Sequence, residues 1–474
     1  MGGRLVVVSN RIPTEAEPSG GLVVALHSAL CAKGGIWIGS HPDLSEAPSA
    51  QLQPIGNEQR YTRLAFQITQ REHEEFYLGF ANSVLWPVCH RRGDLVDFKR
   101  SFQNAYMEVN KRLARLIVDV VEPDDLIWIQ DYHFFPLASE LRKLGFTGRI
   151  GFFLHIPFPT LGDLGALPES ANLADWLADY DLVGLQTRAD VARCLEMFRS
   201  QNQAEVMLDG RIKYGAQVFA VRSFPIGIDV KAFARAASQT PTGADLGPDM
   251  RGEYILGVDR LDYSKGLPNR FRAFAQYLEK RPDKDRRVSL LQIAPPTREE
   301  VMAYKQIRSE LEELAGRLNG THAELDWTPL RYIHRNINRD LLARLYRGAR
   351  VGMVTPLADG MNLVAKEYVA AQDPDDPGVL VLSHLAGAAE DLTEALLVNP
   401  YDIEGMSDAL SQALDMPLEE RKRRYTACMD QVEKTDVNVW CNSFISALEA
   451  CEAPLGWGNS TMNHNPRKTL KPAT

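Results

Sequence analysis

Side chains that bind anions follow two apolar segments of the sequence, at the point where each segment ends. Arg260 and Lys265 lie in the run DRLDYSKGLPNR, directly after the apolar residues 254–258. Residues 359–367 follow the apolar residues 351–354 and begin with Asp-Gly, where a helix can start. Cationic side chains and the free N–H groups of a helix start both bind phosphate oxygens. The two segments therefore predict a site for a diphosphate.

Two further features of the sequence indicate a nucleotide. Glu367 lies one helical turn beyond the start of the second segment, where a carboxylate can accept hydrogen bonds from two ribose hydroxyls. Gly20 and Gly21 precede the apolar, helix-like residues 22–30, so the backbone there can also approach a ligand closely. Glycines at a helix start are common, and this pair alone favours a binding site and a structural turn equally.

Other polar residues follow further apolar segments in the same way. They are Arg11 after residues 5–8, Asp131 after residues 126–129, His155 after residues 150–154 and Arg298 after residues 288–293. Ligands of doubly wound sheets bind beyond the carboxyl ends of the strands. If all six segments are strands, we expect these groups to meet at one site.

The segments that must position these groups alternate between short apolar runs and helical patterns. Residues 103–120 and 299–318 have the pattern of helices. Runs rich in Val, Ile and Leu predict parallel strands that are buried on both faces. These runs are residues 5–8, 126–129, 150–154, 182–185, 218–221, 254–258, 288–293, 351–354, 379–382 and 396–398. The alternation predicts an α/β protein with doubly wound sheets.

The chain length of 474 residues predicts two domains, since single cores rarely grow beyond ~300 residues. Residues 236–248 (AASQTPTGADLGP) are small, polar and rich in Gly and Pro, as linkers are. We therefore expect one Rossmann-like domain at residues 1–235 and a second at residues 236–452, with the site in the cleft between them. The last helix is expected to pack back on the first domain, and residues 453–474 to form a disordered tail.

Composition and charge argue against several classes of protein. The net charge of −9 at pH 7 argues against a nucleic acid partner, so anionic substrates would need locally concentrated positive charge. No segment reaches the ~18 apolar residues of a membrane span, and the N-terminal apolar run is too short for a secretion signal. The six cysteines are scattered along the chain. We expect a cytoplasmic protein without membrane contact.

Several longer motifs resemble those of the trehalose-6-phosphate synthases, which are retaining glycosyltransferases of the GT-B fold. The motifs are VVVSNRIP, NSVLWP, DYHFFPLASELR, GFFLHIPFPT, DYDLVGLQT, PIGID, VDRLDYSKGLPNR and DGMNLVAKEYVAAQ. The resemblance implies two facing Rossmann-like domains. It further implies transfer of glucose from a nucleotide-glucose, with UDP as the expected nucleotide, to glucose-6-phosphate. A homo-oligomer of four subunits and a role in osmoprotection are also implied.

The resemblance also implies roles for individual residues. Glucose-6-phosphate would be held by Arg11, Tyr77, Trp86, Asp131 and Arg298, and its α anomer would be selected by Trp86 and Ile156. The nucleotide-glucose would be held by Gly20, Gly21, Arg260, Lys265, Ile337, Asp359, Gly360, Met361, Asn362, Leu363, Val364, Ala365, Lys366 and Glu367. The residues implied in catalysis are Asp131, His155, Arg260, Lys265 and Asp359, of which His155 and Asp359 would bond hydroxyls of the donor glucose.

Some of these residues also have an ordinary structural interpretation. Tyr77 and Trp86 lie in an apolar stretch, and His155 is flanked by apolar residues, so each could belong to a core. We interpret His133 as structural. The acidic residues 373–376 lie between a helix and a strand, where Asp and Pro form turns. Since no cluster of His, Cys and carboxylates has metal-ligand spacing, we expect no metal and no cofactor.

The sequence departs from the family pattern at four places. Gln130 stands where relatives commonly have His, and Ala358 where they often have Arg. Gly39-Ser40-His41-Pro42 replaces a loop that contains Trp, and Ile337 stands where some relatives have an aromatic residue beside the base. The last difference leaves the choice of nucleobase open.

An α-linked donor and an α,α product imply that configuration is retained. Double displacement would need a carboxylate nucleophile near the anomeric carbon, as in retaining glycosidases, and no such pair occurs at matching strand ends. We therefore expect front-face attack, with the leaving diphosphate accepting the acceptor's proton while Arg260 and Lys265 stabilise its charge. Two alternatives remain, a sister transferase with another phosphorylated acceptor and a catalytically silent regulator that binds sugar phosphates.

Overall fold

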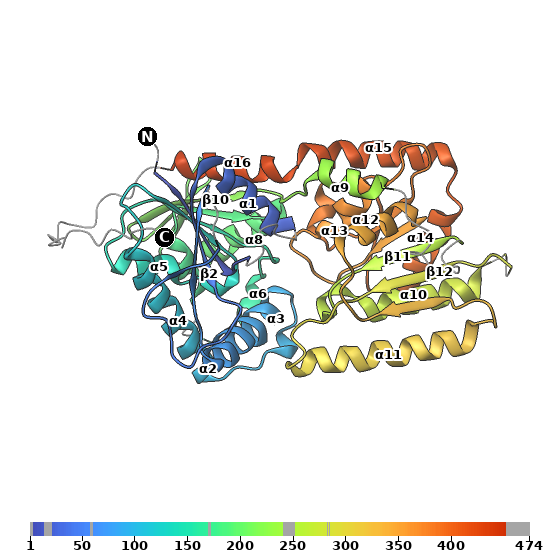
Figure 1. Cartoon of the computed structure of the whole chain (residues 1–474), viewed down its shortest axis with the longest axis horizontal. Helices are drawn as coiled ribbons and strands as arrows, with labels where there is room; N and C mark the ends of the chain where they lie inside the picture. Colours follow the sequence, from blue (N-terminus) through green and yellow to red (C-terminus); the bar gives the residue numbers. More distant parts are fainter. Residues whose placement is uncertain are drawn as a thin grey trace.

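The computed structural model describes residues 3–13, 21–56, 60–168, 172–239, 252–281, 283 and 285–451. Two parallel-rich sheets, each packed against helices, form two halves that lie side by side (Figure 1). This arrangement confirms the predicted α/β class with two facing Rossmann-like domains. Within the described ranges, no helix is long and apolar enough to cross a membrane.

The first sheet has ten strands in the order β3-β4-β2-β1-β5-β6-β7-β10-β9-β8. Its central strands pair in parallel: β4 (Thr62–Phe66), β2 (Gly35–Ser40), β1 (Leu5–Arg11), β5 (Leu126–Gln130), β6 (Ile150–Phe153), β7 (Leu182–Leu185) and β10 (Gln217–Ser223). Antiparallel edges are added by β3 (Gln53–Pro54), β9 (Arg211–Tyr214) and β8 (Ala204–Val206). Val6 packs into the core on one face of β1 and Val7 into the core on the other, which explains why the run is apolar throughout.

The second sheet has six strands, and every pair is parallel. Their order is β13 (Leu330–Ile333), β12 (Ser289–Ile293), β11 (Tyr254–Val258), β14 (Val351–Val354), β15 (Val379–Ser383) and β16 (Leu396–Val398). Strand order reverses between β11 and β14, as it does between β1 and β5 of the first sheet. Such reversals open the crevice in which doubly wound sheets bind their ligands.

Helices cover the sheets. The first half holds α1 (Gly21–Lys33), α4 (Arg100–Val118), α5 (Leu137–Lys143), α7 (Leu173–Ala178) and α8 (Arg188–Arg199). The second holds α10 (Leu267–Lys280), α11 (Met302–His322), α12 (Arg339–Gly348), α13 (Leu363–Ala371), α14 (Ile403–Leu414) and α15 (Leu418–Lys434). The first half also holds the 13-residue π-helix η1 (His73–Leu85). Short helical segments are α2 (Gln70–Glu72), α3 (Trp86–Cys89), η2 (Gly93–Leu95), η3 (Tyr132–Phe134), α6 (Leu161–Leu164), η5 (Tyr263–Lys265) and η6 (Gly387–Glu390).

The chain passes between the halves twice. Helix α9 (Val230–Ser238) packs on α12 and α13, so the first crossover is at residues 224–229. Helix α16 (Val437–Glu449) follows α15 and lies over the first half (Figure 1), where it packs Phe444 on Trp128 of β5, with ring centroids 4.5 Å apart. The boundary expected at residue 235 therefore falls inside α9, because the first residues of the proposed linker are helical. Residues 240–248 of that linker and the tail from residue 453 lie outside the described residues.

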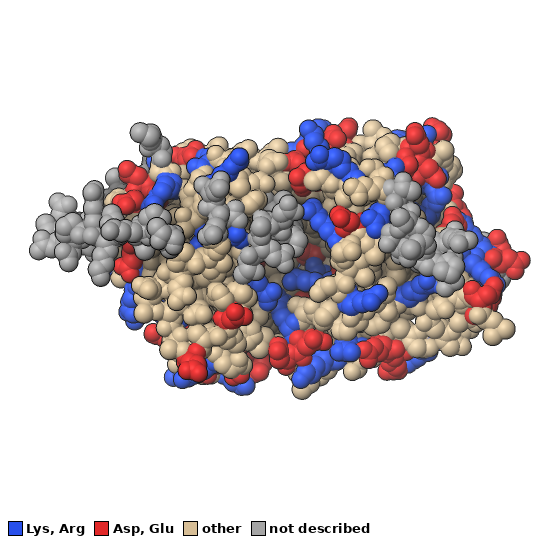
Figure 2. All heavy atoms as spheres, in the orientation of Figure 1, with Lys and Arg blue, Asp and Glu red and all other residues tan. Residues whose placement is uncertain are grey.

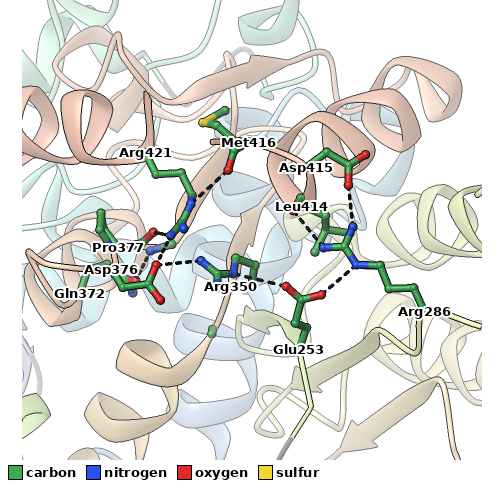
Figure 3. A network of polar contacts seen from close by, with 12 residues as sticks. Glu253, Arg286, Arg350, Gln372, Asp376, Pro377, Leu414, Asp415, Met416 and Arg421 are labelled. Carbon is green, nitrogen blue, oxygen red and sulfur yellow. Dashed lines mark hydrogen bonds and ion pairs between the residues drawn. The ribbon is translucent and has the colours of Figure 1, made fainter. Parts of the chain in front are cut away.

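The acidic run at residues 373–376 belongs to a network of ion pairs (Figure 3). Asp376 accepts hydrogen bonds from Arg350 at 3.2 Å and from Arg421 at 2.5 Å. Asp373 pairs with Arg347 at 2.7 Å. These arginines account for the acidic run as a structural turn. Among the described residues, no group of three or more His, Cys, Asp or Glu is placed to hold a metal ion.

Candidate active site

Residues that follow strands of both sheets meet between the two halves. Arg260 and Arg298, which follow β11 and β12, both lie over the ring of Trp86 in the first half. Gly360, after β14, approaches the carbonyl of His155, after β6, so closely that a Cβ atom at Gly360 would lie 2.3 Å from that oxygen. Lys and Arg side chains gather at this junction (Figure 2). The fold thus brings the strand-end residues of both sheets into one cleft.

Arg298 crosses from the second half to the first. Its guanidinium carbon lies 3.8 Å from the centroid of the Trp86 ring. Nη1 donates to Asp262 at 3.3 Å and to the Tyr304 hydroxyl at 2.5 Å, and Nη2 donates to the Tyr132 hydroxyl of the first half at 3.1 Å. Burial alone would raise the pKa of Asp262, but positive charges, that of Arg298 above all, lower this pKa to about 2. The cation is therefore balanced by a carboxylate that stays ionised.

Tyr77 lies beside this cluster on the π-helix η1. Its ring lies between those of His73 and His133, with centroid distances of 5.3 Å and 5.8 Å. Arg11 donates to the Tyr77 hydroxyl at 3.3 Å. Burial alone would raise the pKa of Tyr77, but the charges of Arg298 and Arg11 lower it below its usual value. Tyr77 is thus packed on one side and in contact with the cations of the cleft on the other.

Trp86 combines the two interpretations that the sequence left open. It is 4% exposed and therefore belongs to the core. Its ring also lies between Arg298 and His90, whose ring centroid is 4.1 Å away. Burial lowers the pKa of His90 to about 4, so this stacking partner is neutral. Ile156, expected beside Trp86 at the acceptor, is also buried.

Lys265 and Asp359 of the second half are paired with each other. Lys265 Nζ lies 2.5 Å from Asp359 Oδ2, which also accepts a hydrogen bond from the Asn362 amide at 2.9 Å. Asn362 has a φ of +78° and caps α13, its side-chain oxygen accepting from the Ala365 N–H. The first turn of α13 leaves backbone N–H groups without intrahelical partners, directly beside Lys265. This is the arrangement from which the sequence predicts a diphosphate site.

Two neighbouring side chains of α13 lie in different environments. Glu367 accepts from the Tyr346 hydroxyl at 3.4 Å. Burial raises the pKa of Glu367 to about 7, although the charge of Arg339 opposes the shift. Lys366 is fully buried and donates to the Ile226 carbonyl on the crossover at 3.0 Å. The Lys366 amine was expected to hold the nucleotide-glucose, but in the structure it is bonded to the crossover between the halves.

Asp131 and His155 lie together at the end of the first sheet. Asp131 has a φ of +73°, and its Oδ1 accepts from the backbone N–H of His155 at 3.2 Å. Burial raises the pKa of Asp131 to about 6. Both ring nitrogens of His155 lie within hydrogen-bond reach of protein partners, Gln130 at 2.9 Å and Gln186 at 3.5 Å.

The remaining expected donor residues differ in accessibility. Gly20 lies outside the described residues, and Gly21 begins α1. Met361 and Ala365 are buried, so they can meet a ligand mainly through their backbone. Leu363, Val364 and Ile337 are partly buried and pack against the core.

Several residues of the cleft were not singled out from the sequence. They are Tyr132, Asp262, Tyr304, His90 and Gln186. Asp262 lies in the same run as Arg260 and Lys265, so its position after a strand was a signal that could have found it. The others act through contacts between distant parts of the chain, which a single sequence does not display.

Comparison with known proteins identifies the family of this chain. The family model for glycosyltransferase family 20 matches residues 5–450. A trehalose-6-phosphate synthase from Sodalis glossinidius is 46% identical over 453 residues, which cover 94% of this chain and 96% of that protein.

Two solved structures share the fold over nearly their whole length. One, from E. coli and bound with UDP-2-fluoro glucose, is 44% identical with a TM-score of 0.91, covering 94% of this chain and 99% of that chain. The other is an alpha,alpha-trehalose-phosphate synthase (UDP-forming) from Burkholderia xenovorans in complex with glucose-6-phosphate. It is 43% identical with a TM-score of 0.88, covering 94% of this chain and 100% of that chain. The chain therefore belongs to glycosyltransferase family 20.

Proposed function

We propose that this protein transfers glucose from UDP-glucose to glucose-6-phosphate with retention, forming trehalose-6-phosphate and UDP. The observation that carries the proposal is the stacking of Arg298, from the second half, on Trp86 of the first, beside Tyr77 and Arg11. This cluster of cations and hydroxyls is suited to a phosphorylated sugar. The names and ligands of the related proteins support the same pair of substrates.

The acceptor is assigned to the side of the cleft nearest the first sheet. Its phosphate is bound by Arg11, Tyr77 and Arg298, and its sugar ring packs against Trp86. Asp131, directly after β5, accepts a hydrogen bond from a sugar hydroxyl. The Trp86 ring is held between the Arg298 guanidinium and the His90 imidazole. Because its position is fixed in this way, it can favour one anomer of the acceptor.

The donor is assigned to the side nearest the second sheet. Arg260, Lys265 and the first turn of α13 bind the diphosphate, and Glu367 accepts from the ribose hydroxyls. Asp359 accepts from a hydroxyl of the transferred glucose. Ile337 lies toward the base, where an apolar side chain offers no hydrogen bond to choose one base over another.

Transfer then proceeds on one face of the donor sugar. The acceptor's C1 hydroxyl bonds to the anomeric carbon while the bond from that carbon to the diphosphate oxygen breaks. The hydroxyl proton passes to the leaving diphosphate oxygen. Lys265 and the N–H groups of α13 stabilise the charge that develops there, and their fixed positions make this stabilisation effective. We assign no metal ion to this role.

A donor and acceptor panel tests the function. The purified protein is incubated with glucose-6-phosphate and with UDP-, GDP- or ADP-glucose, and the products are identified by mass spectrometry. We expect a disaccharide monophosphate, formed fastest from UDP-glucose. Product with glycerol phosphate but not glucose-6-phosphate would indicate a sister transferase, and no product with any pair would indicate a regulator.

We also propose that the protein acts in the cytoplasm, in osmoprotection, as a homotetramer whose domains divide at residues 224–229. The family relationship supports the first three statements, and the placement of α9 supports the fourth. Light scattering of the purified protein measures the assembly. A mass of four chains is expected, and a mass of one chain would contradict it.

A further inference from the structure

A chain of hydrogen bonds links the interdomain crossover to His155. Lys366 Nζ donates to the Ile226 carbonyl at 3.0 Å, and the Ile226 N–H donates to Gln186 Oε1 at 3.1 Å. Gln186 Nε2 lies 3.5 Å from His155 Nδ1, and His155 Nε2 lies 2.9 Å from Gln130 Oε1. The chain therefore begins at a buried ammonium on α13 and ends beneath the cleft.

In one of these hydrogen bonds the donor is known without ambiguity, and it fixes the donors and acceptors of the others. The Ile226 backbone N–H can only donate, so the Gln186 oxygen must face it and the Gln186 NH₂ must face His155. An NH₂ group donates, so Nδ1 of His155 carries a lone pair and no proton. The ring proton is then on Nε2, which donates to the Gln130 oxygen.

The surroundings of His155 keep this ring neutral. Gln186 and Gln130 are 2% and 1% exposed, and the rings of Phe153 and Trp440 lie 4.7 Å and 6.0 Å from the imidazole. Burial lowers the pKa of His155 to about 3. A glutamine NH₂ directed at Nδ1 further opposes a second ring proton, since both groups would then be donors.

We propose that Gln186 and Gln130 are positioning residues for the transfer, which hold His155 as its neutral Nε2–H tautomer. The inference rests on the proposed function, and it implies that His155 cannot act as a general base. Its Nδ1 lone pair is used by Gln186 and its Nε2–H by Gln130, so the ring has no free lone pair with which to remove a proton. His155 is thus excluded as the base, in agreement with the proposed passage of the acceptor's proton to the leaving diphosphate. Gly360 of the second half packs against the His155 carbonyl, so this residue lies where the two halves meet.

The tautomer can be measured on the wild-type protein without substrate. We would label histidine with ¹⁵N, record the imidazole signals between pH 5.5 and 8, and assign His155 by its loss in His155→Gln. We expect a neutral Nε2–H ring at every pH. An Nδ1–H ring, or titration within this range, would overturn the proposal even if the protein proves to be an active synthase.

Two variants test the consequence for catalysis. Gln186→Leu removes the donor at Nδ1, and we expect kcat to fall at least tenfold while both KM values stay within threefold. Gln130→Glu keeps the acceptor at Nε2 and replaces an amide nitrogen that has no partner among the described residues. Its carboxylate favours a charged ring, so a new ionisation should enter the pH profile of kcat.

Gln372→Glu is the matched control for Gln130→Glu, because it also replaces a buried glutamine with glutamate and so shows what that change alone does to stability. Gln372 is 3% exposed and also accepts a backbone N–H, from Gly378 at 2.8 Å, at the C-terminal end of α13. This variant should keep the wild-type kcat and pH profile. Gln186→Leu with kcat within twofold of wild type, or Gln130→Glu with the wild-type pH profile, would overturn the proposal.

Discussion

The guanidinium carbon of Arg298 lies 3.8 Å from the centroid of the Trp86 ring, and this contact joins the two halves of the molecule at the cleft. Asp262 and Tyr304 hold the same guanidinium from its own half. A planar cation fixed in this way over an aromatic ring is well prepared to bind a phosphate. The contact also means that the proposed acceptor site is complete only when both halves contribute.

Replacing Arg298 with Ala should mainly raise the KM for glucose-6-phosphate. Loss of one charge-assisted hydrogen bond costs about 1.5–3 kcal/mol, which corresponds to roughly 10- to 150-fold in KM. Initial rates at saturating donor measure this value. Arg298→Lys, which keeps the charge but loses the planar fork, should give an intermediate KM. An unchanged acceptor KM with a raised donor KM would show that Arg298 serves the donor instead.

Replacing Lys265 with Ala should lower kcat much more than it changes the acceptor KM. In the proposed mechanism Lys265 stabilises the charge that develops on the leaving diphosphate. By analogy with one oxyanion donor, its loss should cost roughly 2.7–4 kcal/mol, or 100- to 1000-fold in kcat. Lys280, a surface lysine paired with Glu404, provides the control, since Lys280→Ala should change little. A kcat for Lys265→Ala within threefold of wild type would remove this residue from the mechanism.

Donor affinity should weaken as the pH falls through 7. Burial raises the pKa of Glu367 to about 7, so below this pH the carboxyl is protonated and can no longer accept from both ribose hydroxyls. Since the ionised fraction falls about tenfold per pH unit below the pKa, the Kd for UDP-glucose should rise by about tenfold between pH 8 and pH 6. Calorimetric titration measures this Kd without acceptor. Glu367→Gln should bind weakly at every pH, and an equally steep profile in that variant would assign the effect to another group.

Activity should persist after chelation of divalent ions. In the proposed mechanism the positive potential at the diphosphate comes from Arg260, Lys265 and the start of α13, so no metal ion is needed there. The rate is measured after dialysis against excess EDTA, with the chelator present in the assay. If chelation abolishes activity and a divalent ion restores it, the reaction requires a metal ion, which contradicts the proposed mechanism.

The sequence predicted the parts of the fold that depend on local apolar runs. All ten predicted strands are present, because strands buried on both faces are apolar without interruption. Six strands were missed, and all of them lie toward the edges of the two sheets: β2, β3, β4, β8, β9 and β13. Polar residues interrupt most of these strands, as Arg331 interrupts the LRYI of β13. The π-helix η1, which carries Tyr77, has no signal of its own in a single sequence, since its wider turn shows only in the backbone.

The same distinction holds for the site. Arg298 and Asp131 follow strands, so the sequence could place them at a sheet edge. The bond from Arg298 to Tyr132 joins positions 166 residues apart, and the bond from Gln186 to His155 depends on how two loops are folded together. Such contacts follow from tertiary packing, which strand-end patterns do not specify.

The stereochemistry of the product tests the account most directly. UDP-glucose labelled with ¹³C at C1 is incubated with the protein and glucose-6-phosphate, and the product is examined by proton and carbon NMR. We predict that the labelled carbon is α-linked to an α-configured C1 of the acceptor, giving a non-reducing disaccharide with two α-anomeric protons. A β-linked labelled carbon, a product with a free reducing end, or labelled free glucose as the main product would contradict it.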